Sequence, residues 1–393
     1  MLFILIYMLA LEFKGKKEVI AADQSTKDIL KNGFFGYEKD GSLYLLPEEV
    51  LYLVDIRNAE CKKDGKILSF DQVAEIFSKK KKLMASYFAY KDWRERGLVI
   101  KPSNTYYKKP DINPIKKYPS SNIELPKWNA SGVFFKDDLV TIVREQEKGK
   151  ELYEKYWLGQ YGSYKAPEKG KLNKLDIYET LYLMEHKKIN IEGMDAKEII
   201  SIAKKRRKDF PMLYQVYKDW RNNGYIVKTG FKFGTHFRVY FPGAKPGSNS
   251  SKEEWAHSKH VLHVFPRDSR LLISEWARAI RVAHSVRKTF ILAIPGEVKE
   301  KEVGIDYILY HRHGGEADNP EKDSPKYAML SLGEEEQIGG KELAGAISKA
   351  KEMKLELIIA IADRETAITY YKVKQIMLPK SGHEYYEIDW MQP

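Results

Sequence analysis

Cysteine and recognisable metal-binding patterns are scarce in this chain of 393 residues. The single cysteine, Cys61, excludes an internal disulfide and a cysteine-based zinc cage. The nine histidines include no HExxH motif, so the sequence gives little sign of a catalytic metal. We therefore expect a cytoplasmic protein that uses no metal and no other cofactor.

Long apolar runs are missing as well. The apolar segment 1–11 is short for a membrane span, and no basic residues precede it as they do in a signal peptide. We expect it to form a buried strand or to pack on a neighbour, with no membrane contact. The 67 Lys and Arg outnumber the 55 Asp and Glu, and the net charge of +12 suggests a polyanionic partner such as nucleic acid. A basic soluble protein without such a partner explains the charge equally well.

An internal repeat is the most informative feature that the sequence does contain. Residues 90–101, YKDWRERGLVIK, return 127 positions later as residues 217–228, YKDWRNNGYIVK. Upstream, residues 47–54 and 177–184 share apolar residues at helical spacing after an acidic first turn. We therefore predict two N-type units, A and A′, each with a small sheet, helices and a Gly-containing turn into a final strand.

A second repeat occupies the C-terminal part of the chain. Residues 275–294 resemble residues 342–361, again at a constant spacing, here of 67 positions. A helix followed by a buried strand predicts α/β units, which we call B and B′. We expect one further strand after each repeat, at 305–312 in B and at 368–375 in B′.

The repeats together predict an internally duplicated, multi-domain α/β protein. Two α+β N-type units come first, separated by a proline-rich linker, and two α/β C-type units follow. The predicted ranges are 1–120 for A, 128–250 for A′, 255–313 for B and 326–380 for B′.

Comparison of the copies separates shared scaffold from residues present only once. Tyr240, His257 and Lys288 find no counterpart in the sister copies, where Ser324 aligns with His257 and Leu355 with Lys288. Taken singly, each of the three is typical of an ordinary strand, loop or helix end. Together they suit metal-independent RNA cleavage, which needs a base for the 2′-hydroxyl, an acid for the leaving 5′-oxygen and positive charge at the phosphate.

Three segments contain these residues: KTGFKFGTHFRVY at 228–240, HSK at 257–259 and RAIRVAHSVRK at 278–288. They closely resemble the archaeal tRNA-splicing endonuclease family, and the match spans roughly residues 134–312. The resemblance implies that the matching tyrosine, histidine and lysine form a catalytic triad. It also implies that the C-type units are restriction-endonuclease-like and that A and B′ are degenerate family copies.

The same resemblance implies a substrate, products and residue roles. The substrate is precursor tRNA, cleaved without metal at both intron boundaries of a bulge-helix-bulge motif to leave a 2′,3′-cyclic phosphate and a 5′-hydroxyl. Tyr240 is implied as general base, His257 as general acid and Lys288 as the group that stabilises the transition state. Arg281 and Arg312 are implied to hold a bulged base between them by cation–π stacking. For Arg312 a solvated arginine at a strand end is the alternative.

The order of the units resembles the fused form of the family, in which a single chain forms a homodimer. An acidic loop in B′ that contains Asp363 and Glu365 is then implied to dock on a neighbouring unit. An ordinary charged turn is the alternative for these two residues.

Unit A′ contains an insertion that unit A lacks. Residues 161–174 make up this basic stretch, and we predict that Lys165 within it contacts an RNA phosphate. A tolerated, solvated loop explains the insertion equally well.

Two other classes of function remain as alternatives. A non-catalytic RNA-binding or assembly subunit would be built from units such as A and B′, but the retained tyrosine, histidine and lysine argue against it. A metal-dependent DNA nuclease needs a carboxylate cluster at its sheet, and none accompanies the three residues in the sequence.

Overall fold

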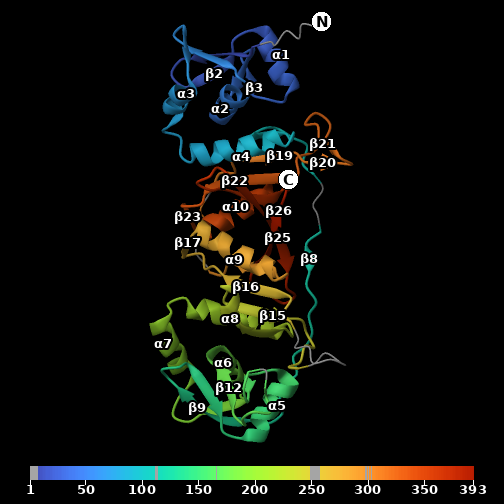
Figure 1. The fold of residues 1–393 in the computed structure, drawn as a ribbon. Helices are drawn as coiled ribbons and strands as arrows, with labels where there is room; N and C mark the ends of the chain where they lie inside the picture. Colours follow the sequence, from blue (N-terminus) through green and yellow to red (C-terminus); the bar gives the residue numbers. More distant parts are fainter. Residues whose placement is uncertain are drawn as a thin grey trace.

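The computed structural model describes residues 8–110, 114–164, 166–247, 257–296, 299, 301 and 303–393. The molecule is elongated, with unit A at one end, unit A′ at the other and one continuous sheet between them (Figure 1). The predicted α/β class with duplicated units is confirmed. Among the described residues, no helix has the combined length and apolar character that crossing a membrane requires.

Unit A is a small α+β unit. Its sheet contains β1 (Ala10–Lys14), β2 (Glu18–Ala21), β3 (Tyr37–Lys39), β4 (Ser42–Leu45), β5 (Glu60–Lys63) and β6 (Lys66–Leu68). Its helices are α1 (Gln24–Asn32), α2 (Pro47–Ile56), α3 (Phe70–Phe77) and α4 (Leu83–Glu95).

Unit A′ repeats this design at the opposite end of the molecule. Its sheet contains β9 (Ala130–Phe135), β10 (Val140–Val143), β11 (Gln160–Tyr161), β12 (Asn173–Asp176) and β13 (Ile189–Ile191). Its helices are α5 (Gln146–Tyr156), α6 (Ile177–Glu185), α7 (Ala196–Arg206) and α8 (Phe210–Asn222). The start of α6 is fixed by a capping box, because Asp176 accepts a hydrogen bond from the Glu179 amide and Glu179 accepts one from the Asp176 amide.

The central sheet joins both units. In spatial order its strands are β14 (Ile226–Thr229), β15 (Phe237–Tyr240), β16 (His260–Val264), β18 (Thr289–Ala293), β26 (Tyr385–Met391), β25 (Ile368–Met377), β24 (Glu356–Ala362), β22 (Tyr327–Gly333), β19 (Tyr307–Leu309) and β7 (Ile100–Pro102). A short strand, β8 (Lys116–Lys117), pairs with β25 beside this path. Smaller elements are β17 (Arg270–Leu272), β20 (Arg312–His313), β21 (Glu316–Ala317), β23 (Gln337–Gly339) and the 3₁₀ turn η1 (Phe231–Phe233).

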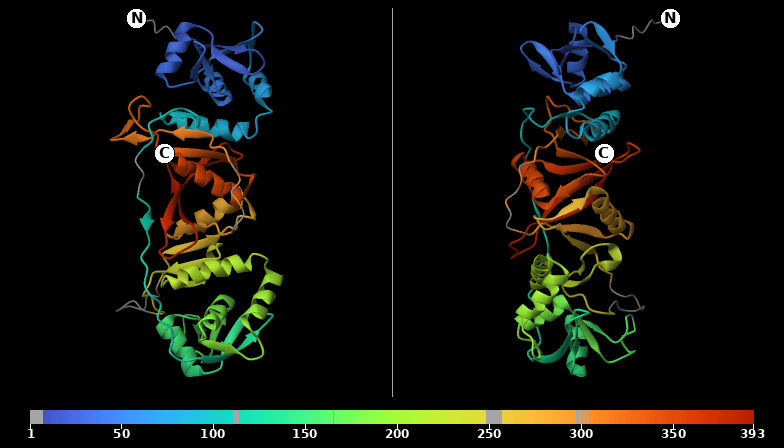
Figure 2. Two further views of the ribbon diagram at one scale, coloured as in Figure 1. Left: turned by 180° about the vertical axis from the view of Figure 1, so that it is seen from behind. Right: turned by 90° about the vertical axis from the view of Figure 1, so that its left-hand side faces the viewer.

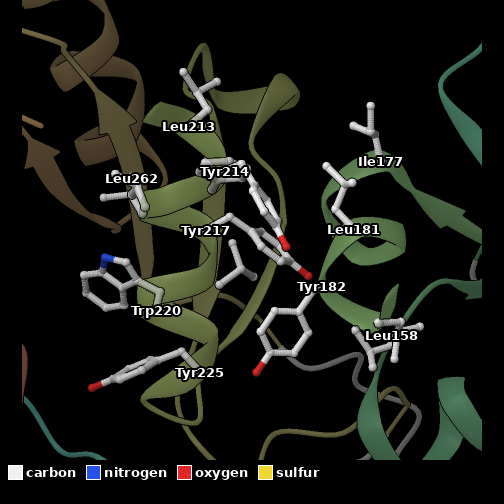
Figure 3. Close-up of a cluster of buried hydrophobic side chains, with 14 of the residues drawn as sticks. Leu158, Ile177, Leu181, Tyr182, Leu213, Tyr214, Tyr217, Trp220, Tyr225 and Leu262 are labelled. Carbon is white, nitrogen blue, oxygen red and sulfur yellow. The ribbon is translucent and has the colours of Figure 1, made fainter. Parts of the chain in front are cut away.

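Helices cover both faces of the central sheet. Because successive side chains of a strand point to opposite faces, neighbours on one strand enter different cores. On β16, Val261 packs in the core that contains α9 (Ile273–Ser285) and α10 (Gly340–Glu352), whereas Leu262 packs in the core beneath α8. Figure 3 shows α8 between Leu262 on one side and Leu181 of α6 on the other. Helix α8 therefore attaches unit A′ to the sheet.

The strand pairing is equivalent at the two ends of the central sheet. Arg238 on β15 pairs with Lys228 and Val261, and Ile308 on β19 pairs with Lys101 and Ala328. These partners differ by 127 and 67 positions, which are the two repeat spacings in the sequence. Strand β19 is therefore the counterpart of β15. We call residues 130–296 with 385–391 the A′ half, and residues 8–102 with 303–377 the A half.

Both expected strands are present, as β19 within 305–312 and as β25 at 368–377, but they do not occupy equivalent places in the sheet. Strand β19 pairs with β7 and β22, at the outer end of the A half, and the strand beside β18 is β26. The chain thus leaves the A′ half after β18, completes the A half and returns to the A′ half with its last strand. The four predicted domain ranges remain a proposal. The strand pairing divides the chain differently, because β26 of the A′ half lies beyond residue 380 and β19 of the A half lies before residue 313.

A linker connects the two N-type units along one side of the molecule (Figure 2). Within it, β8 adds to the edge of β25, and both Lys116 and Tyr118 contact the Glu387 carboxylate of β26, at 2.6 and 2.5 Å. The linker is therefore attached to the centre of the sheet rather than spanning free between the units.

The repeated YKDW motif attaches each N-type unit to the sheet. Its tryptophans, Trp93 and Trp220, are fully buried. Its aspartates accept hydrogen bonds from the sheet: the Tyr370 hydroxyl donates to Asp92 at 2.7 Å and the Tyr385 hydroxyl donates to Asp219 at 2.6 Å. The motif recurs because each half needs the same contact between its N-type helix and its central strand.

We predict that Tyr385→Phe lowers the free energy of unfolding by about 2 kcal/mol, because the half-buried Asp219 carboxylate loses a hydrogen bond from its neighbour. The matched variant Tyr370→Phe is expected to have a similar cost, and urea unfolding measures both. Because the two contacts lie in different halves, their effects should add in the double variant. Wild-type stability in either single variant would contradict this account of the motif.

Candidate active site

A cavity of about 540 Å³ lies in the A′ half between unit A′ and the end of the central sheet. It is lined by side chains from α5, β12, α6, β14, η1 and β15, and by residues that flank β16 and β18. Tyr240, His257 and Lys288 all line it, although they come from three separate segments of the chain. The structure therefore brings the predicted catalytic residues together, while their chemical roles remain predictions.

Tyr240 is the last residue of β15, and its side chain is 5% exposed. Its ring centroid lies 4.6 Å from that of Trp157, which follows α5 in unit A′. Burial raises the pKa of Tyr240, and the nearby charge of Arg238 acts in the opposite direction. Deprotonation of this phenol therefore depends on cations close to its ring.

Lys288 lies at the turn from α9 into β18. The turn is formed by Arg287, whose φ of 54° is left-handed, and by the hydrogen bond from the Lys288 amide to the Ala283 carbonyl oxygen. The ammonium group is buried, donates a short hydrogen bond to the Ser258 carbonyl oxygen and lies 5.0 Å from the ring centroid of Phe233. Burial lowers the pKa of Lys288, and the charge of Arg238 lowers it further.

His257 is exposed and comes just before β16. Its neighbour Ser258 is buried and also lines the cavity, so the hydrogen bond from Lys288 to the Ser258 carbonyl links the histidine segment to the lysine turn. An exposed imidazole on the wall of a cavity can reach both solvent and a bound substrate, which suits proton transfer.

A buried ion pair forms the floor of the cavity. Lys228 lies 2.5 Å from Glu179, and the Gly159 amide also donates to this carboxylate. The same arrangement occurs in unit A, where the Gly36 amide donates to Glu49 and Lys101 lies nearby, donating to the Gly36 carbonyl oxygen. The pair therefore belongs to the shared scaffold of both halves.

The entrance of the cavity combines cations and aromatic rings that sequence reasoning did not single out. Lys232 of η1 approaches the Tyr164 hydroxyl at 3.4 Å and its ring centroid at 4.6 Å. Burial acts to raise the pKa of Tyr164, but hydrogen bonds from Lys232 and Arg238 lower it overall. Phe231, which precedes Lys232 in η1, is 88% exposed. Lys165, the predicted RNA contact that follows Tyr164, lies outside the described residues.

The two predicted RNA-binding arginines are not among the described residues that line this cavity. Arg281 is exposed on α9, and its charge acts to lower the pKa of the Tyr371 phenol on β25, which burial raises. Arg312 lies in the A half, where its guanidinium donates to the Arg96 carbonyl oxygen. Within one chain, neither arginine reaches the cavity, and their contact with RNA stays a prediction.

The predicted assembly loop is the exposed turn between β24 and β25. The Asp363 carboxylate accepts hydrogen bonds at 2.9 Å from the amides of Glu365 and Ala367, so it also shapes its own turn. Arg364 between the two acids pairs with Glu335 at 2.7 Å. Docking of this turn on another unit stays a prediction.

The A half has kept one of the three cavity residues. We expected no counterpart of Tyr240, but Tyr310 occupies the equivalent position. The Tyr310 amide donates a hydrogen bond to the Val99 carbonyl oxygen, and Tyr240 pairs with Ile226, the residue that corresponds to Val99 in the repeat. Tyr310 is buried, which raises its pKa to about 12. The sequence comparison missed it because the repeats flanking β15 and β19 are interrupted at these strands.

Within the described ranges, no three side chains of His, Cys, Asp or Glu are grouped closely enough to hold a metal ion.

Comparison with known proteins identifies the domains. The family model described as tRNA intron endonuclease, catalytic C-terminal domain, matches residues 210–303. The model described as tRNA intron endonuclease, N-terminal domain, matches twice, at residues 10–74 and 133–204, which supports the duplication of the N-type unit.

Archaeal proteins named tRNA-splicing endonuclease are similar to the chain. One from Methanococcoides burtonii is 27% identical over 75% of this chain and 96% of its own length. One from Methanosarcina mazei is 26% identical over 77% of this chain and 98% of its own. One from Methanopyrus kandleri is 38% identical over 37% of this chain and 79% of its own. With both domain types present and the cavity at their junction, this chain belongs to the tRNA intron endonuclease family.

Proposed function

We propose that the cavity of the A′ half cleaves precursor tRNA at bulge-helix-bulge motifs and leaves a 2′,3′-cyclic phosphate and a 5′-hydroxyl. The observation that supports this most directly is that Tyr240, His257 and Lys288 line one cavity from three separate segments. Family membership supports the substrate class, and the residue types support the chemistry.

The proposed reaction is an in-line attack within the RNA. Tyr240 takes the proton of the 2′-hydroxyl, and the 2′-oxygen bonds to the adjacent phosphorus as the bond to the 5′-oxygen breaks. His257 gives a proton to that leaving oxygen, so one proton is taken up and one is released. Solvent then restores both groups for the next cycle.

Lys288 supplies positive charge for the phosphate in this scheme. Its ammonium is buried, and a charge in a water-poor site interacts with a developing anion more strongly than one in bulk water. The hydrogen bond to the Ser258 carbonyl holds it in place before substrate binds, so little reorganisation is needed during the reaction.

The cavity entrance suits the unpaired nucleotides of a bulge. Lys232 offers charge for the backbone, and the exposed ring of Phe231 offers a surface on which a base can stack. Tyr164 lines the cavity, and Lys165 follows it in the sequence. Lys165, Arg281 and Arg312 therefore remain the proposed RNA contacts of the chain.

We predict that the purified protein cleaves a bulge-helix-bulge RNA in EDTA, and that end-group analysis finds a cyclic phosphate. His257→Ala is expected to bind this RNA with nearly wild-type affinity but to lower the cleavage rate at least about 100-fold, as loss of a general acid does. Binding without cleavage by the parent protein would instead indicate an RNA-binding subunit. Cleavage only after magnesium is added would indicate a metal-dependent nuclease.

Alanine variants of Lys165, Arg281 and Arg312 extend the same assay. Each is expected to weaken RNA binding, while the unfolding midpoint stays that of the parent. Unchanged affinity in a variant removes that residue from the proposed contacts.

We also propose that the chain works as a homodimer that is assembled through the turn containing Asp363 and Glu365. Charge reversal at both acids is expected to shift the sedimentation coefficient towards that of a monomer. The neutral pair Asp363→Asn with Glu365→Gln is the matched control, because an asparagine can still accept the hydrogen bonds that shape the turn. A dimer that survives charge reversal would contradict this assignment.

A further inference from the structure

Arg238 shares the cavity with the proposed catalytic residues and has no role assigned so far. It lies on β15 two positions before Tyr240, and alternate residues of a strand point to the same face of the sheet. Both side chains accordingly line the cavity. The guanidinium carbon lies 5.7 Å from the centroid of the Tyr240 ring.

The environment of Arg238 is unusual for a structural arginine. Its Nε atom is buried, and within the described part of the chain no acceptor is within hydrogen-bond reach of it. The guanidinium also acts on the Tyr164 phenol, whose pKa it helps to lower. Buried arginines usually pair with a carboxylate, whereas the half-buried Arg238 directs its charge at two phenols.

The A half supplies an internal comparison. Ile308 occupies the position of Arg238 there. Arg238 pairs with Lys228 and Val261, and Ile308 pairs with their repeat counterparts, Lys101 and Ala328. Ile308 is fully buried in the core. The A half thus keeps the tyrosine and the floor lysine but lacks the arginine, the histidine and the cavity lysine. Arg238 groups with the proposed chemistry rather than with the scaffold.

Several other groups face Tyr240, and none of those among the described residues replaces the charge of Arg238 at its ring. Tyr153 and Tyr164 act to raise the pKa of Tyr240. The charge of Lys228 on the cavity floor is paired with Glu179, with Asp176 beside them. Lys288 donates to the Ser258 carbonyl and His257 is exposed to solvent.

We propose that Arg238 is a positioning residue whose guanidinium stabilises the phenolate that Tyr240 must form to accept the proton of the 2′-hydroxyl. This inference rests on the proposed function of the cavity. The guanidinium itself transfers no proton, because it stays charged throughout the accessible pH range. It acts instead by raising the fraction of Tyr240 that is present as phenolate, the form that accepts a proton.

The test is the single-turnover cleavage rate between pH 6 and pH 9, measured in EDTA with a bulge-helix-bulge RNA. A cation that favours the charged form of a phenol lowers its pKa, so removing the cation raises it. Arg238→Gln is therefore expected to lower the rate at pH 7 by roughly tenfold or more, since each pKa unit changes the phenolate fraction tenfold. The loss should shrink as the pH rises, and Arg238→Lys should retain part of the rate.

Two controls separate this role from a structural one. Arg57→Gln removes the same charge from an exposed site in unit A, and its pH profile is expected to match that of the parent. Replacing Tyr240 with a fluorinated tyrosine, whose phenol is more acidic, is expected to restore the rate of Arg238→Gln at pH 7.

A rate loss that is equal at every pH, or that the fluorinated tyrosine does not relieve, would overturn the inference and leave the proposed function intact. If the parent protein makes no cyclic phosphate in EDTA, the proposed function fails first, so the two failures are distinguishable. If Arg238→Gln alone folds poorly, Arg238→Lys with the fluorinated tyrosine gives the same comparison.

Discussion

The pairing of β25 with β26 at the centre of the sheet is the constraint on which the rest of the structure depends. The register runs from Tyr370 opposite Met391 to Ile376 opposite Tyr385, and it joins the two halves into one hydrogen-bonded sheet. The tyrosines of these strands hold the aspartates of the two YKDW motifs. The positions of both N-type units, and with them the cavity wall that A′ provides, follow from this central pair.

A shared sheet allows the two halves to differ in chemistry. The A half keeps the buried carboxylate of Glu49 with Lys101 nearby, at the junction of its N-type unit with the sheet. It lacks counterparts of Arg238, His257 and Lys288, and apolar Ile308 and Leu355 extend its core instead. Such a half contributes folding stability and a surface, while the A′ half holds the cavity residues.

Local patterns in the sequence predicted much of this organisation. The YKDW repeat predicted the two N-type units, and the absence of His257 and Lys288 from the sister copies predicted which side chains meet in the cavity. Strand pairing was harder to predict from the sequence. Strands β19 and β26 pair with strands far away in the chain, and no local pattern indicates which sheet edge a strand joins. Arg238 was overlooked for the same reason, since its counterpart becomes visible only through the register of β19.

The central claim is that one half of a duplicated sheet performs the cleavage and the other supports it. Tyr240 and Tyr310 occupy equivalent positions in the two halves, so they form a matched pair. The most direct measurement is the single-turnover cleavage rate of Tyr240→Phe beside that of Tyr310→Phe. The account predicts a loss of about 100-fold or more for Tyr240→Phe, as for other general bases, and a rate near that of the parent for Tyr310→Phe. Equal losses in the two variants would contradict it.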